Sequence, residues 1–166
     1  STAHLYLGSD GSTVLSGTST ASSSNVTIQA DKASFIANGS YKTNLITSGA
    51  VVVESVGSTF TAALDATSLN ISGSPSSVRF GKNTNTGNVT LGSAITAAGP
   101  ISVYGGDITL QKNLTSTLAG AAIKLMATGT ITSNTAANTI TTNGGAVVLA
   151  SDTDGNDLGK IYSGND

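Results

Sequence analysis

Cysteine is absent from the 166 residues, and charged residues make up only 10% of them. Without cysteine the chain has no disulfides, no thiolate metal ligands and no cysteine nucleophile. The formal net charge is −2, so the chain lacks the basic field that attracts phosphate backbones, and we expect no nucleic-acid partner. No apolar run approaches the ~20 residues of a membrane span, so we expect no such span.

Aromatic residues are also scarce, at 4%, and tryptophan is missing. Any core must therefore consist mainly of Val, Ile, Leu and Ala, and a hydrophobic content of 38% is high enough to favour order despite the 20 glycines. Residues 1–7 lack the basic and apolar regions of a signal peptide. If the protein is exported, its signal must lie elsewhere, and we expect residues 1–166 to be one segment of a longer chain.

A short apolar-x-apolar signature recurs along the chain. Successive first positions are separated by 21, 25, 27, 23, 22 and 24 residues, a spacing too regular for chance and typical of a structural repeat. The seven copies are Leu5-x-Leu7, Val26-x-Ile28, Val51-x-Val53, Val78-x-Phe80, Ile101-x-Val103, Ile123-x-Leu125 and Val147-x-Leu149.

Each period offers two further short β-rich pieces. One ends in a glycine-containing corner and begins at Ile46, Ile71, Ile95, Leu118 or Ile140. The other lies between these landmarks, at residues 34–36, 59–61, 89–91, 108–110 and 130–132. Each period thus predicts about three strands and three turns.

Three strands per 21–27 residues predict an all-β fold, a right-handed single-stranded parallel β-helix (β-solenoid) of about seven rungs. The apolar residues would point inward, and the intervening Ser, Thr, Asn and Lys would face water. Residues 119–127 come closest to a helical pattern but carry the signature in register, so we predict a strand there. A β-sandwich is the alternative, but it does not require a sustained period.

The repeat is clearest in residues 99–110 (GPISVYGGDITL), 129–134 (GTITSN) and 143–149 (NGGAVVL), and the same pattern covers most of residues 26–150. These repeats resemble the β-solenoid stalks of filamentous-haemagglutinin-like adhesins, large bacterial exoproteins exported by two-partner secretion. The resemblance implies a secreted or bacterial cell-surface protein that serves in cell adhesion, in biofilm formation or as a matrix scaffold.

Catalytic residues are not evident, and we expect no enzyme. The acids Asp31, Glu54, Asp65 and Asp107 lie at different offsets from their rung starts, whereas paired carboxylates would be needed to cleave a polysaccharide. Arg79 and Lys124 occupy solvent-facing positions and are interpreted as solubilising charges.

A cluster of oxygen ligands lies at Asp152, Asp154, Asn156 and Asp157. Such ligands alternate in calcium loops, so calcium is a possible cofactor there; we expect no other. The EF-hand spacing is not met, because the glycine is fourth in the loop rather than sixth, and an ordinary polar turn is the alternative.

Two further patterns have simpler explanations. Asn-x-Ser/Thr triplets at Asn25, Asn38, Asn70, Asn88 and Asn113 fit glycosylation, but also fit structural roles at strand entries. Thr-x-Thr pairs raise the alternative of an ice-binding solenoid, but the pairs starting at residues 59, 84, 128 and 139 have different offsets in their rungs.

These observations favour a structural or adhesive stalk segment. Its expected partners are a host-surface or matrix glycan or protein, or neighbouring copies of itself, and its longest insertions, residues 72–88 and 152–157, are the expected recognition features. The alternative is a carbohydrate-binding or polysaccharide-cleaving β-helix.

Overall fold

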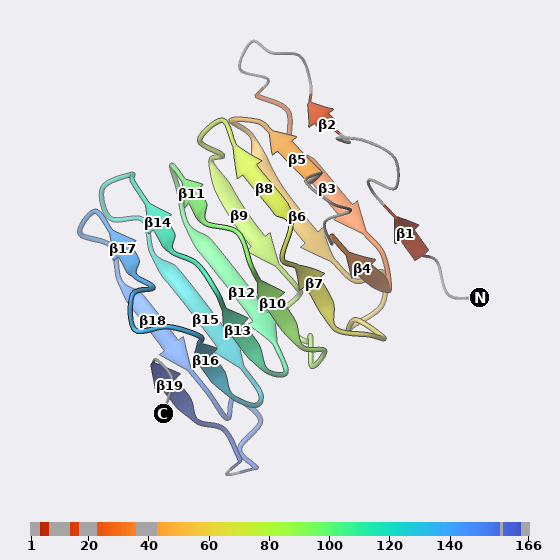
Figure 1. The fold of residues 1–166 in the computed structure, drawn as a ribbon, viewed down its shortest axis with the longest axis vertical. Helices are drawn as coiled ribbons and strands as arrows, with labels where there is room; N and C mark the ends of the chain where they lie inside the picture. The colour runs from red at the N-terminus through yellow and green to blue at the C-terminus, as the bar shows by residue number, and fades with distance from the viewer. Residues whose placement is uncertain (1–3, 7–13, 17–22, 36–42, 157, 164–166) are drawn as a thin grey trace.

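The computed structural model describes residues 4–6, 14–16, 23–35, 43–156 and 158–163, with the backbone alone described for the first two segments. The described residues form 19 short strands and no helix. The strands stack into three parallel sheets, and the chain visits the three sheets in the same order on every turn (Figure 1). The fold is a parallel β-solenoid, as the period predicts.

Each sheet collects every third strand. Sheet A consists of β1 (His4–Tyr6), β4 (Lys32–Ser34), β7 (Leu64–Ala66), β10 (Val89–Leu91), β13 (Ile108–Leu110), β16 (Ile131–Ser133) and β19 (Ile161–Ser163). Sheet B consists of β2 (Val14–Ser16), β5 (Thr43–Ile46), β8 (Leu69–Ser72), β11 (Ile95–Ala97), β14 (Leu114–Ser116) and β17 (Ile140–Thr142). Sheet C consists of β3 (Val26–Gln29), β6 (Ala50–Glu54), β9 (Ser77–Phe80), β12 (Ile101–Gly105), β15 (Ile123–Ala127) and β18 (Val147–Ala150).

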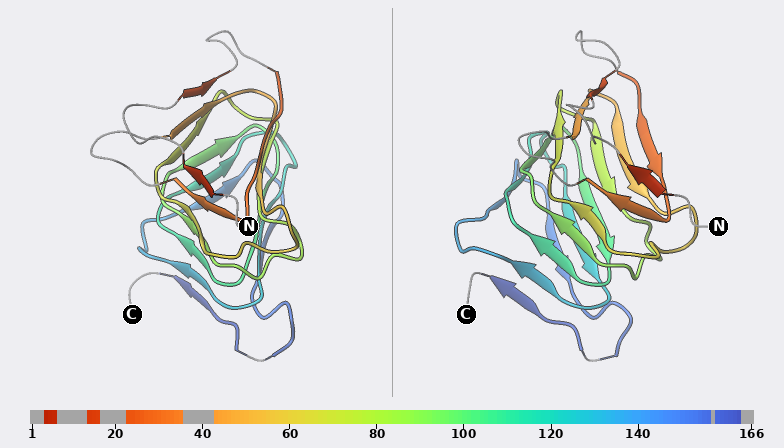
Figure 2. Two further views of the ribbon diagram at one scale, coloured as in Figure 1. Left: turned by 90° about the vertical axis from the view of Figure 1, so that its right-hand side faces the viewer. Right: turned by 45° about the vertical axis from the view of Figure 1, so that its right-hand side comes forward.

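Figure 2 shows the chain coiling around a common axis, and Figure 1 shows β1 and β19 at opposite ends of the stack. The three sheets enclose an aliphatic interior in which Leu45, Leu64 and Ile101 are fully buried. Residues alternate between this interior and the surface, as in β12, whose inward Ile101 and Val103 are buried while Ser102 and Tyr104 are half-buried.

Six of the seven predicted signatures form sheet C, and their first residues are paired from turn to turn. Val26 pairs with Val51, Val51 with Val78, Val78 with Ile101, Ile101 with Ile123 and Ile123 with Val147. The predicted strand at 119–127 is confirmed as β15. Because inward residues of adjacent turns must stack on one another, the sequence spacing equals the length of each turn.

The predicted count of about seven rungs differs slightly from the described strands, which make six sets of three plus β19. Leu5 belongs to sheet A, where it pairs with Ala33, and not to the column of the other six signatures. Its partner in the signature, Leu7, lies outside the described residues. An inward-outward-inward doublet suits any of the three sheets, so the doublet by itself does not identify the sheet.

Some predicted positions in the other two sheets are also wrong. Residues 59–61 form a loop, and the sheet A strand of that turn is β7. In sheet B the inward residues are Leu45 and Leu114, which belong to one paired column, whereas Ile46 and Leu118 are exposed. Side-chain apolarity marks strands in general, but only the pairing with adjacent turns decides which residue faces inward.

Candidate functional site

A charged cluster lies on the outer side of sheet C. The Glu54 carboxylate accepts a hydrogen bond from Gln29 Nε2 at 2.6 Å and another from Arg79 Nη2 at 2.7 Å. Arg79 Nη1 also donates to the carbonyl oxygen of Gly81 at 2.9 Å. The three side chains come from β3, β6 and β9, so the cluster ties three consecutive turns together.

Glu54 is buried in spite of its charge, and its environment favours the ionised form. The hydrogen bond from Gln29 lowers the pKa of Glu54, and the hydrogen bond and positive charge of Arg79 lower it further, while burial opposes them. Arg79 is therefore not the purely solubilising charge that its outward position suggested. Lys124, by contrast, is exposed on β15.

Two loops at one corner of the solenoid, residues 55–61 and 82–87, lie on top of one another and are called the stacked loops here. The buried Asn85 joins them: its Oδ1 accepts hydrogen bonds from Thr59 Oγ1 at 2.9 Å, Phe60 N at 3.0 Å and Gly87 N at 3.1 Å. Its Nδ2 donates to the carbonyl oxygens of Gly87 at 3.0 Å and Tyr104 at 2.8 Å.

Lysine and threonine side chains add further bonds between the stacked loops. Lys82 Nζ donates to the carbonyl oxygens of Val56 at 3.0 Å and Gly57 at 2.8 Å. Thr84 Oγ1 donates to the carbonyl oxygen of Ser58 at 2.7 Å. These side-chain hydrogen bonds replace the backbone hydrogen-bond ladder where the chain leaves the sheet, and they hold the loops in one conformation.

Asparagine side chains at strand entries bridge adjacent turns in the same way. The Oδ1 atoms of Asn25, Asn88 and Asn113 accept hydrogen bonds from the N–H groups of Ala50, Asp107 and Thr139 at 2.9, 2.8 and 3.0 Å. These are three of the five Asn-x-Ser/Thr positions, and a fourth, Asn38, lies outside the described residues. A structural role at strand entries, expected from the sequence as the alternative to glycosylation, therefore explains why asparagine stands at these three positions.

The predicted calcium ligands lie in an exposed turn after β18. Asp152 adopts a positive φ of 58°, and its Oδ1 accepts a hydrogen bond from Asn156 N at 2.9 Å. Asn156 Nδ2 donates to Asp154 Oδ2 at 2.9 Å, and Asn156 Oδ1 accepts from Leu158 N at 3.0 Å. The three side chains come together as a polar turn, while Asp157 lies outside the described residues. Calcium at this turn stays a prediction.

The acids considered for catalysis lie on different parts of the solenoid. Glu54 ends a sheet C strand, Asp65 is the middle residue of a sheet A strand, and Asp107 lies at the corner between β12 and β13. Asp107 Oδ1 accepts a hydrogen bond from Thr130 N at 2.9 Å, which continues the bridge that begins at Asn88. Asp31 Oδ1 accepts one from Gly57 N at 3.4 Å. Within the described residues, no three histidine, cysteine or acidic side chains gather as metal ligands would.

Threonines do form files, although of the Thr-x-Thr pairs starting at residues 59, 84, 128 and 139 only the last contributes a member, Thr141. Residues 90, 109 and 132 are paired on sheet A, and residues 96, 115 and 141 are paired on sheet B. Each file is one threonine wide because a three-residue strand has one outward position. Such files place threonine on the outer face of a sheet as single columns, which do not form a two-dimensional threonine lattice.

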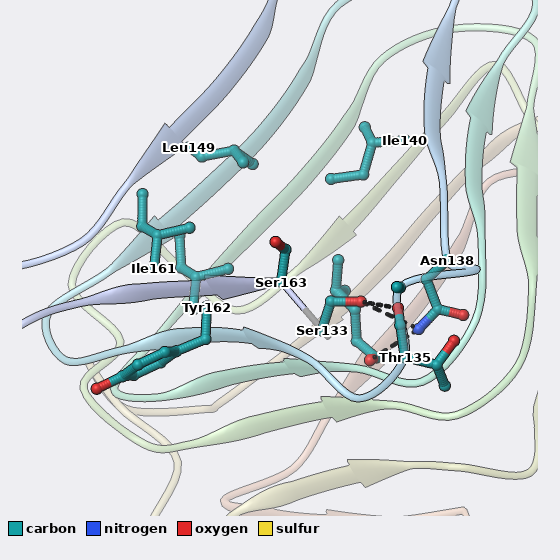
Figure 3. Close-up of a pocket in the computed structure, with 11 residues that line it drawn as sticks. Ser133, Thr135, Asn138, Ile140, Leu149, Ile161, Tyr162 and Ser163 are labelled. Atoms are coloured by element: carbon teal, nitrogen blue, oxygen red, sulfur yellow. Dashed lines mark hydrogen bonds between the residues drawn. The ribbon is translucent and has the colours of Figure 1, made fainter. Parts of the chain in front are cut away.

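An apolar hollow lies at the end of the solenoid formed by β17, β18 and β19 (Figure 3). Ile140, Leu149 and Ile161 line it, one from each sheet, together with Leu110 and Ile131 from the turns below. The polar side chains of Ser133, Thr135 and Asn138 border it. The hollow therefore lies against the aliphatic core at the last strands that the structure describes.

Sequence reasoning missed two features that hold the irregular turns together: the Glu54 cluster and the hydrogen bonds of the Asn85 side chain. A signal existed for the first, because Glu54 and Arg79 lie at the third and first positions after the starts of adjacent turns. The described part of the chain contains no helix of the length and apolarity needed to cross a bilayer. No protein-family model, curated protein or solved structure matches this chain.

Proposed function

We propose that this chain is a non-catalytic rod segment of a bacterial surface or secreted adhesin. The observation that supports the proposal best is the unbroken pairing of sheet C from β3 to β18, in which every strand stacks on its equivalent one turn earlier. The stacking extends the molecule in one direction and gives it a continuous core. Such an architecture suits a spacer that carries a binding surface away from a cell, in the manner of the filamentous-haemagglutinin-like stalks that the repeats resemble.

Rigidity in this rod comes from two sets of interactions. Backbone hydrogen bonds join each strand to the next turn, and the inward aliphatic side chains form columns of buried contacts. The Glu54 cluster and the asparagine bridges add side-chain bonds between turns. Bending the rod would have to break several of these contacts at once.

The stacked loops are the proposed binding surface. They present the exposed residues Val56, Asn83, Thr84 and Thr86 on a backbone that Asn85 fixes. A fixed polar loop with one exposed aliphatic side chain binds without a large ordering cost. We propose a host-surface or matrix glycan or protein as the partner.

Adhesion is tested by coating beads with the whole chain and measuring their retention on epithelial cells and on panels of host glycans and matrix proteins. The variant Val56→Lys/Asn83→Lys changes two exposed side chains of the stacked loops while leaving Asn85 and the hydrogen bonds of Lys82 and Thr84 in place. The control, Thr109→Lys, adds a charge to the outward file of sheet A. We expect the loop variant to lose retention and the control to keep it.

Two outcomes would contradict this proposal. If beads coated with the parent chain are retained no better than beads coated with albumin, the adhesive role is wrong. Equal retention by both variants would place binding away from the stacked loops. Circular dichroism of each variant verifies that the β-structure is intact.

A further inference from the structure

Asn143 and Gly144 lie in the short turn that joins β17 to β18, which stacks on the turn between β14 and β15 (Figure 1). Both residues are exposed. Gly144 has a φ of 73°, and a Cβ built on it would meet no atom within 4 Å. The outer side of this turn is therefore open, and the residue after the asparagine has no side chain to fill it.

This exposure belongs to the corner of the solenoid and not to the last turn alone. Residues 117–120 occupy the same corner one turn earlier, and all four are exposed although residues 142–145 stack on them. Gly120 has a similar φ of 77°, and a Cβ on it would also meet no atom within 4 Å. A further turn stacked in the same way would therefore leave the outer side of residues 143 and 144 accessible.

Three hydrogen bonds define the turn around Asn143. Thr142 Oγ1 donates to the carbonyl oxygen of Gly145 at 2.6 Å, which closes the turn across the Asn-Gly pair. Asn143 Nδ2 donates to the carbonyl oxygen of Thr117 at 3.1 Å, and Gly120 N donates to the carbonyl oxygen of Asn143 at 2.9 Å. Asn143 therefore joins two turns through both its side chain and its backbone.

An asparagine that precedes a glycine has the groups needed to form a cyclic imide. The Gly144 nitrogen gives up its proton to a base and attacks Cγ of Asn143, and the side-chain amide leaves as ammonia. Water then opens the imide at either carbonyl, which leaves aspartate or isoaspartate at position 143. The sum consumes one water and releases one ammonia, with no oxidant or reductant. Glycine favours the attack because no Cβ crowds its nitrogen.

We propose that Asn143 is a site of spontaneous modification, at which the folded chain converts the side-chain amide to aspartate or isoaspartate with water as the co-reactant. Each of the other asparagines in the described part of the chain precedes a residue that has a side chain. A second Asn-Gly pair, Asn38-Gly39, lies outside the described residues. The proposal goes beyond the adhesive role and does not depend on what the stacked loops bind.

Both products would weaken the contact between the two turns. Aspartate has no N–H to donate to the Thr117 carbonyl oxygen, and it would place a negative charge beside that oxygen. Isoaspartate adds a methylene to the main chain, in a turn that the hydrogen bond between Thr142 and Gly145 closes. The modification would therefore add negative charge and loosen the turn between β17 and β18 with time.

The test is incubation of the whole folded chain at physiological temperature and mildly alkaline pH in water enriched in heavy oxygen, followed by peptide mapping with mass spectrometry. Conversion appears as the mass gain of an amide-to-acid change with uptake of heavy oxygen. The internal control is Asn83, which is exposed but precedes the β-branched Thr84. We expect conversion at Asn143 to be at least about tenfold faster than at Asn83, a difference of about 1.4 kcal/mol in activation free energy.

Two variants separate the reaction from its consequence. Asn143→Gln keeps an amide, but its longer side chain would have to close a larger ring, so we expect no detectable conversion at this position over the same time. Asn143→Asp reproduces one product, and we expect it to unfold at a lower urea concentration than the parent chain because the Thr117 carbonyl oxygen loses its donor. Circular dichroism verifies that both variants fold.

The proposal is overturned if the folded chain leaves Asn143 unconverted while the urea-unfolded chain converts it, because the turn would then hold the amide away from the Gly144 nitrogen. It is also overturned if Asn83 converts as fast as Asn143. An Asn143→Asp variant as stable as the parent chain would contradict the loosening of the turn. The adhesion assay with the stacked-loop variant is independent of these results, so failure of one proposal is distinguishable from failure of the other.

Discussion

Replacing Asn85 with alanine should be among the most damaging single polar substitutions in this chain. The side chain is buried, and it makes three accepted and two donated hydrogen bonds across two loops and β12. Alanine leaves the Phe60 N–H and the Tyr104 carbonyl oxygen without these partners. Gly87 N–H keeps a second bond to Thr59 Oγ1 at 2.9 Å, so its loss is smaller.

The expected magnitude follows from those groups. A buried polar group left without a partner costs about 1–3 kcal/mol, and two such groups with a partial loss at Gly87 give about 3–5 kcal/mol in the free energy of unfolding. The control is Asn83→Ala, an exposed position two residues earlier, for which we expect a change within about 0.5 kcal/mol.

Urea unfolding followed by far-ultraviolet circular dichroism measures both variants. Amide hydrogen exchange locates the effect: protection should fall at Phe60 and Gly87 and persist in β15, because the stacked loops are local to two turns. A loss below about 1 kcal/mol for Asn85→Ala, or equal losses for the two variants, would refute the view that this amide organises the loops.

Three other predictions follow from particular contacts. Because the pKa of Glu54 is lowered in the folded protein, the ionised carboxylate stabilises the fold above the ordinary carboxyl pKa of about 4.3, and this stabilisation is lost as the pH falls through the folded pKa. Urea unfolding over this pH range should therefore show a smaller loss of stability with acid for Glu54→Gln than for the parent chain. An equal dependence of stability on pH in the two proteins would contradict this prediction. A Cβ at residue 99 would collide with the carbonyl oxygen of Ser76, so Gly99→Ala should lower the free energy of unfolding in urea by at least about 1 kcal/mol. The control Gly57→Ala, with open space around the added Cβ, should change it by less than about 1 kcal/mol. If the turn after β18 binds calcium, calcium at ten times its Kd should add about 1.4 kcal/mol to the free energy of unfolding and raise the thermal midpoint. Asp154→Asn should reduce this effect. A thermal midpoint of the parent chain that does not change with calcium would contradict calcium binding at this turn.

The architecture was predictable because a solenoid repeats one constraint many times. Each turn must return an inward residue to the same column, so the apolar-x-apolar signature recurs at the length of a turn, and six of seven signatures locate sheet C correctly. The scarcity of aromatic residues likewise predicted a core of aliphatic side chains, which the buried residues confirm.

Errors occurred where one local pattern suits several environments. Thr59-Phe60-Thr61 has strand-forming residues and Phe60 is buried, but its N–H pairs with Asn85 instead of a neighbouring strand. Leu118 is apolar and follows β14, yet it is exposed because Leu114 already occupies the inward column. Local propensity cannot resolve such competition, since the deciding contacts come from the adjacent turn.

The sequence by itself determined the period, the all-β class and the inward columns of sheet C, because these depend on side-chain alternation within short segments. Only the tertiary structure decided which carboxylate would be buried against Arg79 and which asparagine would join the stacked loops. Those outcomes depend on contacts between residues about 25 positions apart, such as Glu54 with Arg79 and Phe60 with Asn85. Unequal turn lengths set these contacts, and their hydrogen bonds form only when the turns are stacked.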